Sequence, residues 1–151
     1  MYRVLVDEET GLYNFQYLME RLQQEINYVS RFRQELVFCL VEVAGLDKLS
    51  QKEAKDRRCK VAEFLTDFFR DYDVVARVDD TKFGVIVRSI SYKNATKRAE
   101  VLMEEFKKRF PEFSDMVYIA LVKASEEVLA NNVFDRAIKA LRAKLHRIGW
   151  G

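Results

Sequence analysis

The segment DVVARVDDTKFGVIV, residues 73–87, contains two short runs of strand-forming residues on either side of a tight polar connection. The runs VVARV (74–78) and KFGVIV (82–87) are rich in β-branched and aromatic side chains, which favour strands. Only Asp79, Asp80 and Thr81 separate them, and so short a connection forces antiparallel pairing. The segment therefore predicts a β-hairpin whose turn is formed by two aspartates and a threonine.

The residues before this hairpin predict a helix, a strand and a second helix. Apolar residues recur at spacings of three and four over about residues 15–32, as on the buried stripe of a helix. The run 36–43 is apolar on both alternations for most of its length, which is typical of a central strand covered on both faces. Ser50 and Glu53 have the spacing of a capping box, which opens a helix over about residues 50–70.

The residues after the hairpin predict helix, strand and helix again. Asn94 is expected to be the N-cap of a helix that ends at Phe110, because Pro111 cannot continue it. MVYIALVKA (116–124) has the composition of a strand, and residues 132–147 carry one apolar stripe on an otherwise charged helix. The element order predicts an α+β fold, with a mixed or largely antiparallel sheet and helices over it.

Composition indicates one compact domain, residues 1–151, because the chain has no linker or repeat and an ordinary domain length. The sequence is 49% hydrophobic and 33% charged, which excludes disorder, and the net charge of +2 is too small to indicate a nucleic-acid partner. No apolar run reaches the roughly 18 residues needed to cross a membrane, and no signal peptide is recognisable. We therefore expect no membrane partner and a cytoplasmic location.

Cysteine and other metal-binding patterns give no indication of a cofactor. Cys39 lies in an apolar run and Cys59 among charged residues, and the pair has neither metal-ligand spacing nor the number expected of a disulfide framework. The sequence therefore predicts two free thiols and no cofactor.

Five segments, in order along the chain, resemble motifs of the GGDEF (diguanylate cyclase) family. They are DEETGLYN (7–14), FCLVEVAGLDKLS (38–50), DVVARVDDTKFGVIV (73–87), VYIALV (117–122) and DRAIKALRAKLHRIG (135–149). They are similar to the family's D-x-L-T-G-L-x-N opening, its D-x-D-x-F-K-x-x-N strand and turn, its R-[YF]-G-G-D-E-F hairpin, its S-I-G-V-A strand and its closing helix. The resemblance implies a cyclase-like palm, in which a five-stranded, mostly antiparallel central sheet is flanked by helices.

The chemistry implied by the resemblance joins two GTP molecules, with two carboxylates holding Mg²⁺ on the triphosphate. Hard Mg²⁺ needs such anionic oxygens to neutralise charge at phosphorus. The matching positions here are Glu42 and Thr81, so one carboxylate is replaced by a hydroxyl. The next acidic position of the turn is Lys82, and a unit charge about 4 Å away is worth roughly 4 kcal/mol at an effective dielectric near 20. This reversal of charge opposes metal binding.

Further departures in the same motifs also oppose GTP binding. The two glycines that let the backbone approach the nucleotide are Asp79 and Asp80 here. Asp47 stands at the phosphate-contacting lysine and Ser50 at the guanine-reading asparagine. Glu42 is expected to pair with a neighbouring lysine or arginine rather than to bind metal. We therefore predict a degenerate GGDEF domain without catalytic activity, in which the turn from Asp79 to Phe83 holds no catalytic residue and which acts through a partner protein or an adjacent sensor domain.

Two alternatives remain open. Arg70 and Asp73 form an R-x-x-D six positions ahead of the turn, the spacing of the family's inhibitory site for cyclic di-GMP. Arg offers a planar fork to phosphate or guanine and Asp can accept from guanine, which would make the domain a receptor. The same residues also suit a helix C-terminus and the turn after it. The second alternative is residual GTP binding or cyclase activity at the altered hairpin, at Lys82. Because two domains of the family face each other during the reaction, a homodimer is also to be tested.

Overall fold

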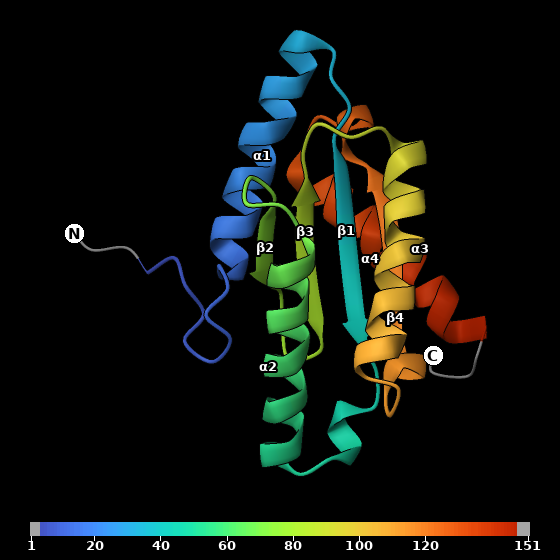
Figure 1. The fold of residues 1–151 in the computed structure, drawn as a ribbon. Helices are drawn as coiled ribbons and strands as arrows, with labels where there is room; N and C mark the ends of the chain where they lie inside the picture. Colours follow the sequence, from blue (N-terminus) through green and yellow to red (C-terminus); the bar gives the residue numbers. More distant parts are fainter. Residues whose placement is uncertain (1–3, 148–151) are drawn as a thin grey trace.

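The structure, a computed structural model, describes residues 4–147 and consists of a sheet with helices on both faces (Figure 1). None of the described helices is long and apolar enough to cross a membrane. Three short 3-10 turns, at Leu46–Lys48, Ser114–Met116 and Ala124–Glu126, join some of the main elements. Those elements are, in chain order, α1 (Phe15–Phe32), β1 (Val37–Val43), α2 (Gln51–Phe68), β2 (Val74–Arg77), β3 (Lys82–Val87), α3 (Tyr92–Arg109), β4 (Val117–Lys123) and α4 (Ala130–Arg147).

The sheet has the order β2-β3-β1-β4, and each neighbouring pair is antiparallel. The predicted hairpin is confirmed, since Val74 pairs with Ile86 and Arg77 with Phe83. The α+β class is also confirmed, but the expected number of five strands is wrong for the described residues, which form four. The number five came from the family resemblance alone, since the sequence itself contains four strand-like runs, 36–43, 74–78, 82–87 and 116–124.

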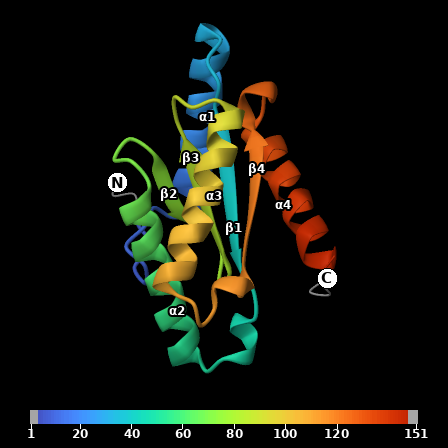
Figure 2. The same ribbon diagram turned by 45° about the vertical axis from the view of Figure 1, so that its right-hand side comes forward.

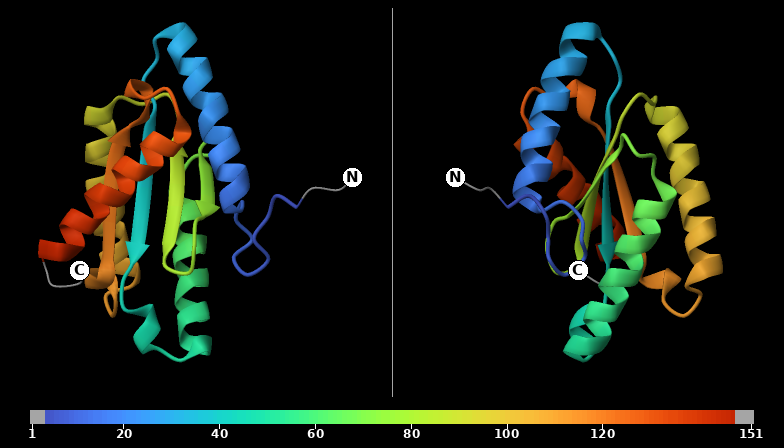
Figure 3. Two further views of the ribbon diagram at one scale, coloured as in Figure 1. Left: turned by 180° about the vertical axis from the view of Figure 1, so that it is seen from behind. Right: turned by 60° about the vertical axis from the view of Figure 1, so that its left-hand side comes forward.

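Two helices cover each face of the sheet. Figure 3 shows α1 and α4 on one face and α2 and α3 on the other. Strand β1 is buried at all seven positions, as expected for a central strand, because its side chains alternate between the two layers. Phe38 and Leu40 pack under α1 and α4, whereas Val37, Cys39 and Val41 pack under α2 and α3. These two apolar layers hold the hairpin rigidly against β1.

The capping residues determine where the helices begin, and one of the predicted caps is wrong. The predicted helix start at Ser50 is confirmed, because its Oγ accepts from the backbone amide of Glu53 at 3.1 Å; the Glu53 carboxylate accepts from the same hydroxyl and not from the Ser50 backbone amide of a full capping box. The expected cap at Asn94 is wrong. Ser91 caps α3, since its Oγ accepts the backbone N–H of Asn94 at 3.1 Å, and the helix begins at Tyr92. Two small polar residues compete within one turn here, and the earlier one satisfies the free amides.

A close approach of α1 to the hairpin requires glycine at position 84. A Cβ added there would lie 2.7 Å from Cδ2 of Leu18 and 3.1 Å from Cζ of Phe38, both fully buried side chains. We expect Gly84→Ala to lower the free energy of unfolding by about 1–2 kcal/mol, because a packed core cannot absorb an extra methyl group. Urea unfolding of Gly84→Ala, Leu18→Ala and the double variant checks this. Strictly additive losses would show that the methyl group does not meet Leu18.

Candidate functional site

The hairpin turn is closed by its own polar side chains. Oδ1 of Asp79 accepts from the backbone amide of Thr81 at 2.9 Å, and the amide of Val78 donates to the carbonyl of Lys82. These are the local bonds that favour aspartate in turns. The turn is also tied to the end of β1, because the amide of Val43 donates to the carbonyl of Thr81 at 2.8 Å. This backbone bond places the side chain of Glu42 beside the turn.

The ammonium group of Lys82 lies between two carboxylates. Its Nζ is 3.3 Å from Oε2 of Glu42 and 3.2 Å from Oδ2 of Asp79. The hydroxyl of Thr81 donates to the same Oε2 of Glu42 at 3.1 Å. The expectation that Glu42 pairs with a lysine or arginine is thus confirmed. The lysine comes from the turn itself, at the family's second acidic position.

Burial and charge act together on these groups. Burial raises the pKa of Glu42, and the nearby charge of Lys82 and the Thr81 hydroxyl offset this only in part. For Asp79, burial alone would raise the pKa, but the Thr81 amide and the Lys82 charge together lower it. Burial alone would lower the pKa of Lys82, and the charges of Glu42 and Asp79 raise it instead. Lys82 therefore stays protonated at neutral pH, as a permanent cation at the turn.

This donor set does not fit Mg²⁺. The ion needs near-octahedral oxygen ligands, and Glu42 and Asp79 already share an ammonium between them. The described residues contain no group of three or more acidic, histidine or cysteine side chains arranged to hold a metal. Asp80 is exposed and pairs with a different cation, Arg77, at 3.0 Å. The arrangement can neutralise charge internally, but it supplies no free anionic ligands.

The remaining positions of the family's nucleotide motifs are exposed or occupied. Asp47 lies exposed in the 3-10 turn Leu46–Lys48 that follows β1. Ser50, at the position of the guanine-reading asparagine, uses its hydroxyl to cap α2. The position matched to the phosphate contact therefore carries an acidic side chain, Asp47, and the position matched to the guanine contact carries a hydroxyl, Ser50, that is already hydrogen-bonded to Glu53.

The structure brings Arg70 and Asp73 together as a bidentate pair. Nε of Arg70 lies 3.1 Å from one carboxylate oxygen of Asp73, and Nη2 lies 3.2 Å from the other. The same oxygens accept backbone amides from Arg70 and Arg88, both at 3.1 Å. The Asp73 side chain has no exposed surface, whereas that of Arg70 is 30% exposed and lies over the ring of Tyr72. The pair fastens the end of α2 to the end of β3.

A charged network that the sequence analysis did not assign holds the N-terminal loop against the hairpin. Arg77 lies 3.3 Å from Asp7 and 3.2 Å from Glu9, and Glu9 also accepts from Arg58 at 2.6 Å. Asp7 in turn accepts from the amide and hydroxyl of Thr10. The spacing of Asp7 and Thr10 is a signal of such a turn, but no local pattern reveals the arginines, which lie 49 and 70 residues away.

This network predicts a loss of stability in acid. Burial raises the pKa of Asp7, but bonds from Thr10 and the charge of Arg77 outweigh it, and a hydrogen bond from Arg58 lowers the pKa of Glu9. Both values lie below their unfolded ones, near 4, so the stabilisation is present above about pH 4.5 and is lost as pH falls through the folded values. Urea midpoints of the wild type and Asp7→Asn, measured from pH 6 to pH 3, should converge in acid. Parallel curves would exclude a role for this carboxylate.

The model of the family "Diguanylate cyclase, GGDEF domain" matches residues 4–146. No curated protein matches the chain.

Solved structures show the same fold at low sequence identity. The GGDEF domain of FimX from Pseudomonas aeruginosa superposes with a TM-score of 0.83 and 14% identity, over 95% of this chain and 94% of that one. The GGDEF domain of DgcB from Caulobacter crescentus, in complex with cyclic di-GMP, gives 0.81 and 16%, over 99% and 91%. The diguanylate cyclase SiaD from P. aeruginosa, in complex with its activator SiaC, gives 0.78 and 20%, over 96% of this chain but 59% of that one. With a family model that covers nearly all of its length, this chain belongs to the GGDEF-domain family.

Proposed function

We propose that this domain is a catalytically inactive GGDEF domain that acts in signalling through contacts with a partner protein or an adjacent domain. One observation carries the proposal: the Lys82 ammonium lies within 3.3 Å of both Glu42 and Asp79, where the family's turn would present carboxylates to a cation. A built-in ammonium satisfies these acids without a metal, so the turn keeps its shape while losing the ligands that catalysis needs.

Contacts with other proteins are the function that an intact fold can retain after such a loss. The two core layers and the hairpin are complete in the described residues. A related structure, SiaD, is held with an activator protein, which supports protein contact as a use of this fold. We place the domain in the cytoplasm, assign it no nucleic-acid or membrane partner, and treat a homodimer as an arrangement to be tested.

Nucleotide binding tests the proposal without relying on turnover. Thermal unfolding with GTP and Mg²⁺ should give the same midpoint as unfolding without them, because the turn offers an ammonium and a hydroxyl in place of two metal ligands. The other alternative, GTP held by Lys82 without metal, predicts instead a rise in the midpoint that Lys82→Ala abolishes. Lys97→Ala, which removes an exposed lysine of α3, is the matched control. A rise that requires Mg²⁺ would overturn the proposal.

Binding of cyclic di-GMP is the second candidate function. Arg70, Asp71 and Asp73 line a surface pocket together with Tyr13, and Arg70 keeps part of its surface exposed. The Arg70 fork is engaged by Asp73, however, so the ligand would have to compete with an internal bidentate pair. Only modest affinity is expected for this reason.

Calorimetry with cyclic di-GMP decides this second candidate. A receptor should release heat with the wild type and with Arg136→Ala, a control arginine on α4 across the sheet, but not with Arg70→Ala. Circular dichroism must first show that Arg70→Ala is folded, because the same arginine braces Asp73. Absence of heat at high ligand concentration with the wild type would remove the receptor function.

A further inference from the structure

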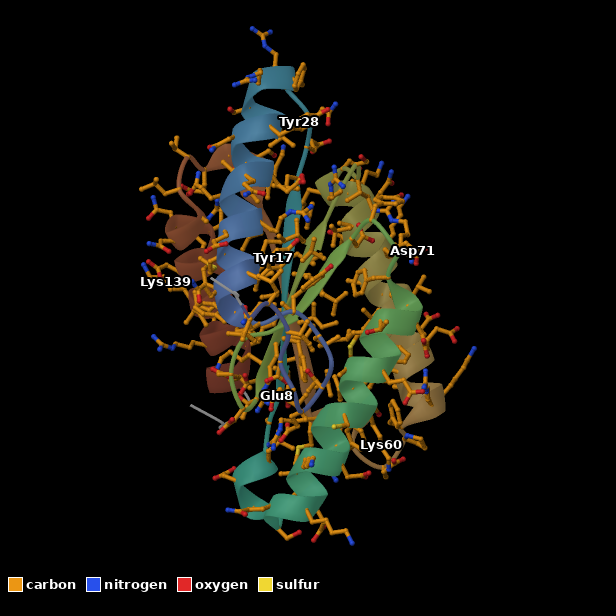
Figure 4. All side chains as sticks on the ribbon, turned by 90° about the vertical axis from the view of Figure 1, so that its left-hand side faces the viewer. Glu8, Tyr17, Tyr28, Lys60, Asp71 and Lys139 are labelled. Carbon is orange, nitrogen blue, oxygen red and sulfur yellow. The ribbon has the colours of Figure 1, made fainter. Side chains whose placement is uncertain are left out.

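Helix α1 has a covered flank and an open flank on either side of its buried face. On the covered flank, the Gln23 side chain donates to the carbonyl of Val128 at 2.9 Å and accepts from the amide of Ala130 at 2.8 Å, so the start of α4 lies against it. Among the described helices, α4 is the one that packs along α1. Figure 4 shows Tyr17 and Tyr28 on the other flank, turned away from α4.

The open flank carries residues at the spacing of a contact between two helices. Tyr17, Arg21, Gln24, Tyr28 and Arg31 follow one another at intervals of four, three, four and three, which keeps them on one line along the helix. These five residues are called the α1 stripe below. Two helices that pack side by side contact each other through positions with this spacing. At 1.5 Å per residue the stripe is about 21 Å long, enough for three to four turns of a second helix.

An excess of positive charge lies beside the middle of the α1 stripe. Arg21 of the stripe and Arg88 at the end of β3 both pair with Glu25, at 3.4 Å and 3.1 Å, and the Glu25 side chain is only 10% exposed. The two arginine side chains remain 26% and 35% exposed, so two cations meet the solvent over one buried anion. A carboxylate that approaches from outside can therefore accept charge-assisted hydrogen bonds from two guanidinium groups.

Aromatic rings lie on both sides of this cationic centre. On one side the hydroxyl of Tyr17 accepts from Arg21 at 3.0 Å. On the other side the ring of Tyr28 lies against that of Phe32, with centroids 4.8 Å apart, and the two residues are 49% and 54% exposed. The C-terminal end of α1 projects beyond the sheet (Figures 1 and 2), so a partner can reach it. Tyrosine, phenylalanine and arginine are enriched at the centres of protein interfaces.

The charge of the α1 stripe indicates which kind of partner fits it. The stripe contains two cations, Arg21 and Arg31, whereas the acids of α1 are Glu25, which is buried, and Glu20, which lies further round the helix. A second copy of the chain would set these arginines against their own equivalents, and like charges across such a contact are destabilising. The net charge of +2 gives the chain little attraction for a nucleic acid. An acidic protein segment complements the stripe better than either.

We propose that the α1 stripe binds an acidic amphipathic helix of a partner protein. One carboxylate of that helix would lie between the guanidinium groups of Arg21 and Arg88. An apolar side chain seven residues away on the same face would contact Tyr28, because Arg21 and Tyr28 are themselves two turns apart. A second carboxylate one turn further along matches Arg31. This inference rests on the protein-contact part of the proposed function and makes it more specific. The stripe does not line the pocket beside Arg70.

Selection of helical peptides displayed on phage against the whole chain tests the α1 stripe. The library varies the residues of one helix face, and enriched peptides should combine aspartate or glutamate with leucine or phenylalanine on that face. Tyr28→Ala and Arg31→Glu should each weaken the enriched peptides about tenfold, because both side chains are exposed and their loss leaves the Glu25 pairs in place. Tyr92→Ala, at an exposed tyrosine of α3, and Arg142→Glu, at an exposed arginine of α4, are the matched controls.

Arg88→Gln tests the cationic centre itself. It removes one of the two cations over Glu25, so it should also weaken the enriched peptides about tenfold and make the remaining binding less sensitive to salt. Urea unfolding of this variant separates a loss of folding from a loss of contact. The two exposed substitutions, Tyr28→Ala and Arg31→Glu, keep the proposal testable if Arg88→Gln is unstable.

Four results would overturn the proposal. Selection could enrich no peptide or only basic ones, or the enriched peptides could bind Tyr28→Ala and Arg31→Glu as tightly as the wild type. Sedimentation could show a dimer that Tyr28→Ala dissociates, which would assign the α1 stripe to a second copy. Oligouridylate could bind the wild type but not Tyr28→Ala, which would assign the stripe to a nucleic acid. None of these results measures cyclase activity, so a failure here is distinct from a failure of the predicted loss of catalysis.

Discussion

Asp73→Ala is expected to lower the free energy of unfolding by about 3–5 kcal/mol, the largest loss predicted for a polar residue in this chain. The carboxylate has no exposed surface and accepts four hydrogen bonds, two from the Arg70 fork and two from backbone amides. Removing it leaves the backbone amides of Arg70 and Arg88 and the Nε of Arg70 without their acceptor, while Nη2 of Arg70 keeps its bond to the carbonyl of Arg88. Urea unfolding at pH 7 measures the loss.

Asp71→Ala is the control for this prediction. Asp71, labelled in Figure 4 near the end of α2, is an exposed aspartate two residues before Asp73. We expect its removal to change stability by less than about 0.5 kcal/mol. Similar losses for the two variants would contradict the view that Asp73 is a structural brace, and would strengthen the case for a ligand-binding role of the R-x-x-D motif.

Lys82→Glu is expected to make the stability of the domain depend on divalent cations. The substitution adds a third carboxylate beside Glu42 and Asp79 and removes the ammonium that both contact. We expect a loss of about 3 kcal/mol in the presence of EDTA, at the lower end for a broken buried pair because the lysine side chain is 23% exposed. Mg²⁺ or Ca²⁺ should restore about 2.7 kcal/mol once the ion exceeds its Kd about 100-fold.

The wild type and Lys97→Glu complete this experiment. Neither should respond to the cation, since the wild-type turn already holds an ammonium and Lys97 is an exposed residue of α3. Thermal unfolding of the three proteins in EDTA and in millimolar Mg²⁺ provides the measurement. If Lys82→Glu proved as stable as the wild type in EDTA, the ammonium would not be neutralising the two acids.

The hairpin and the central strand could be predicted from the sequence because their signals are local. A three-residue polar connection fixes the pairing of residues 74–78 with 82–87, and the apolar run 36–43 can be satisfied only by burial on both faces. The helix at residues 92–109 was predicted with a late start, because Ser91 and Asn94 are both good caps and only the packed chain selects one.

The charges of the side chains at the site could be predicted from the sequence, but their arrangement in space could not. The sequence showed that Lys82 replaces an acid, and it suggested a basic partner for Glu42, but the shared ammonium depends on a backbone bond between Val43 and Thr81 that has no sequence signal. Likewise, Arg70 and Asp73 were recognised as a motif, whereas the amide of Arg88 that completes their pairing comes from another strand end. The predicted number of strands was wrong because it came from the family resemblance, whereas the sequence itself contains four strand-like runs.

Incubation of the purified chain with GTP and Mg²⁺ or Mn²⁺, followed by separation of the products, tests the central claim most directly. The account predicts no cyclic di-GMP above the level of a protein-free control, because an ammonium and a hydroxyl occupy the turn positions where metal ligands are needed. Cyclic di-GMP that forms with the wild type and disappears with Glu42→Ala would contradict it.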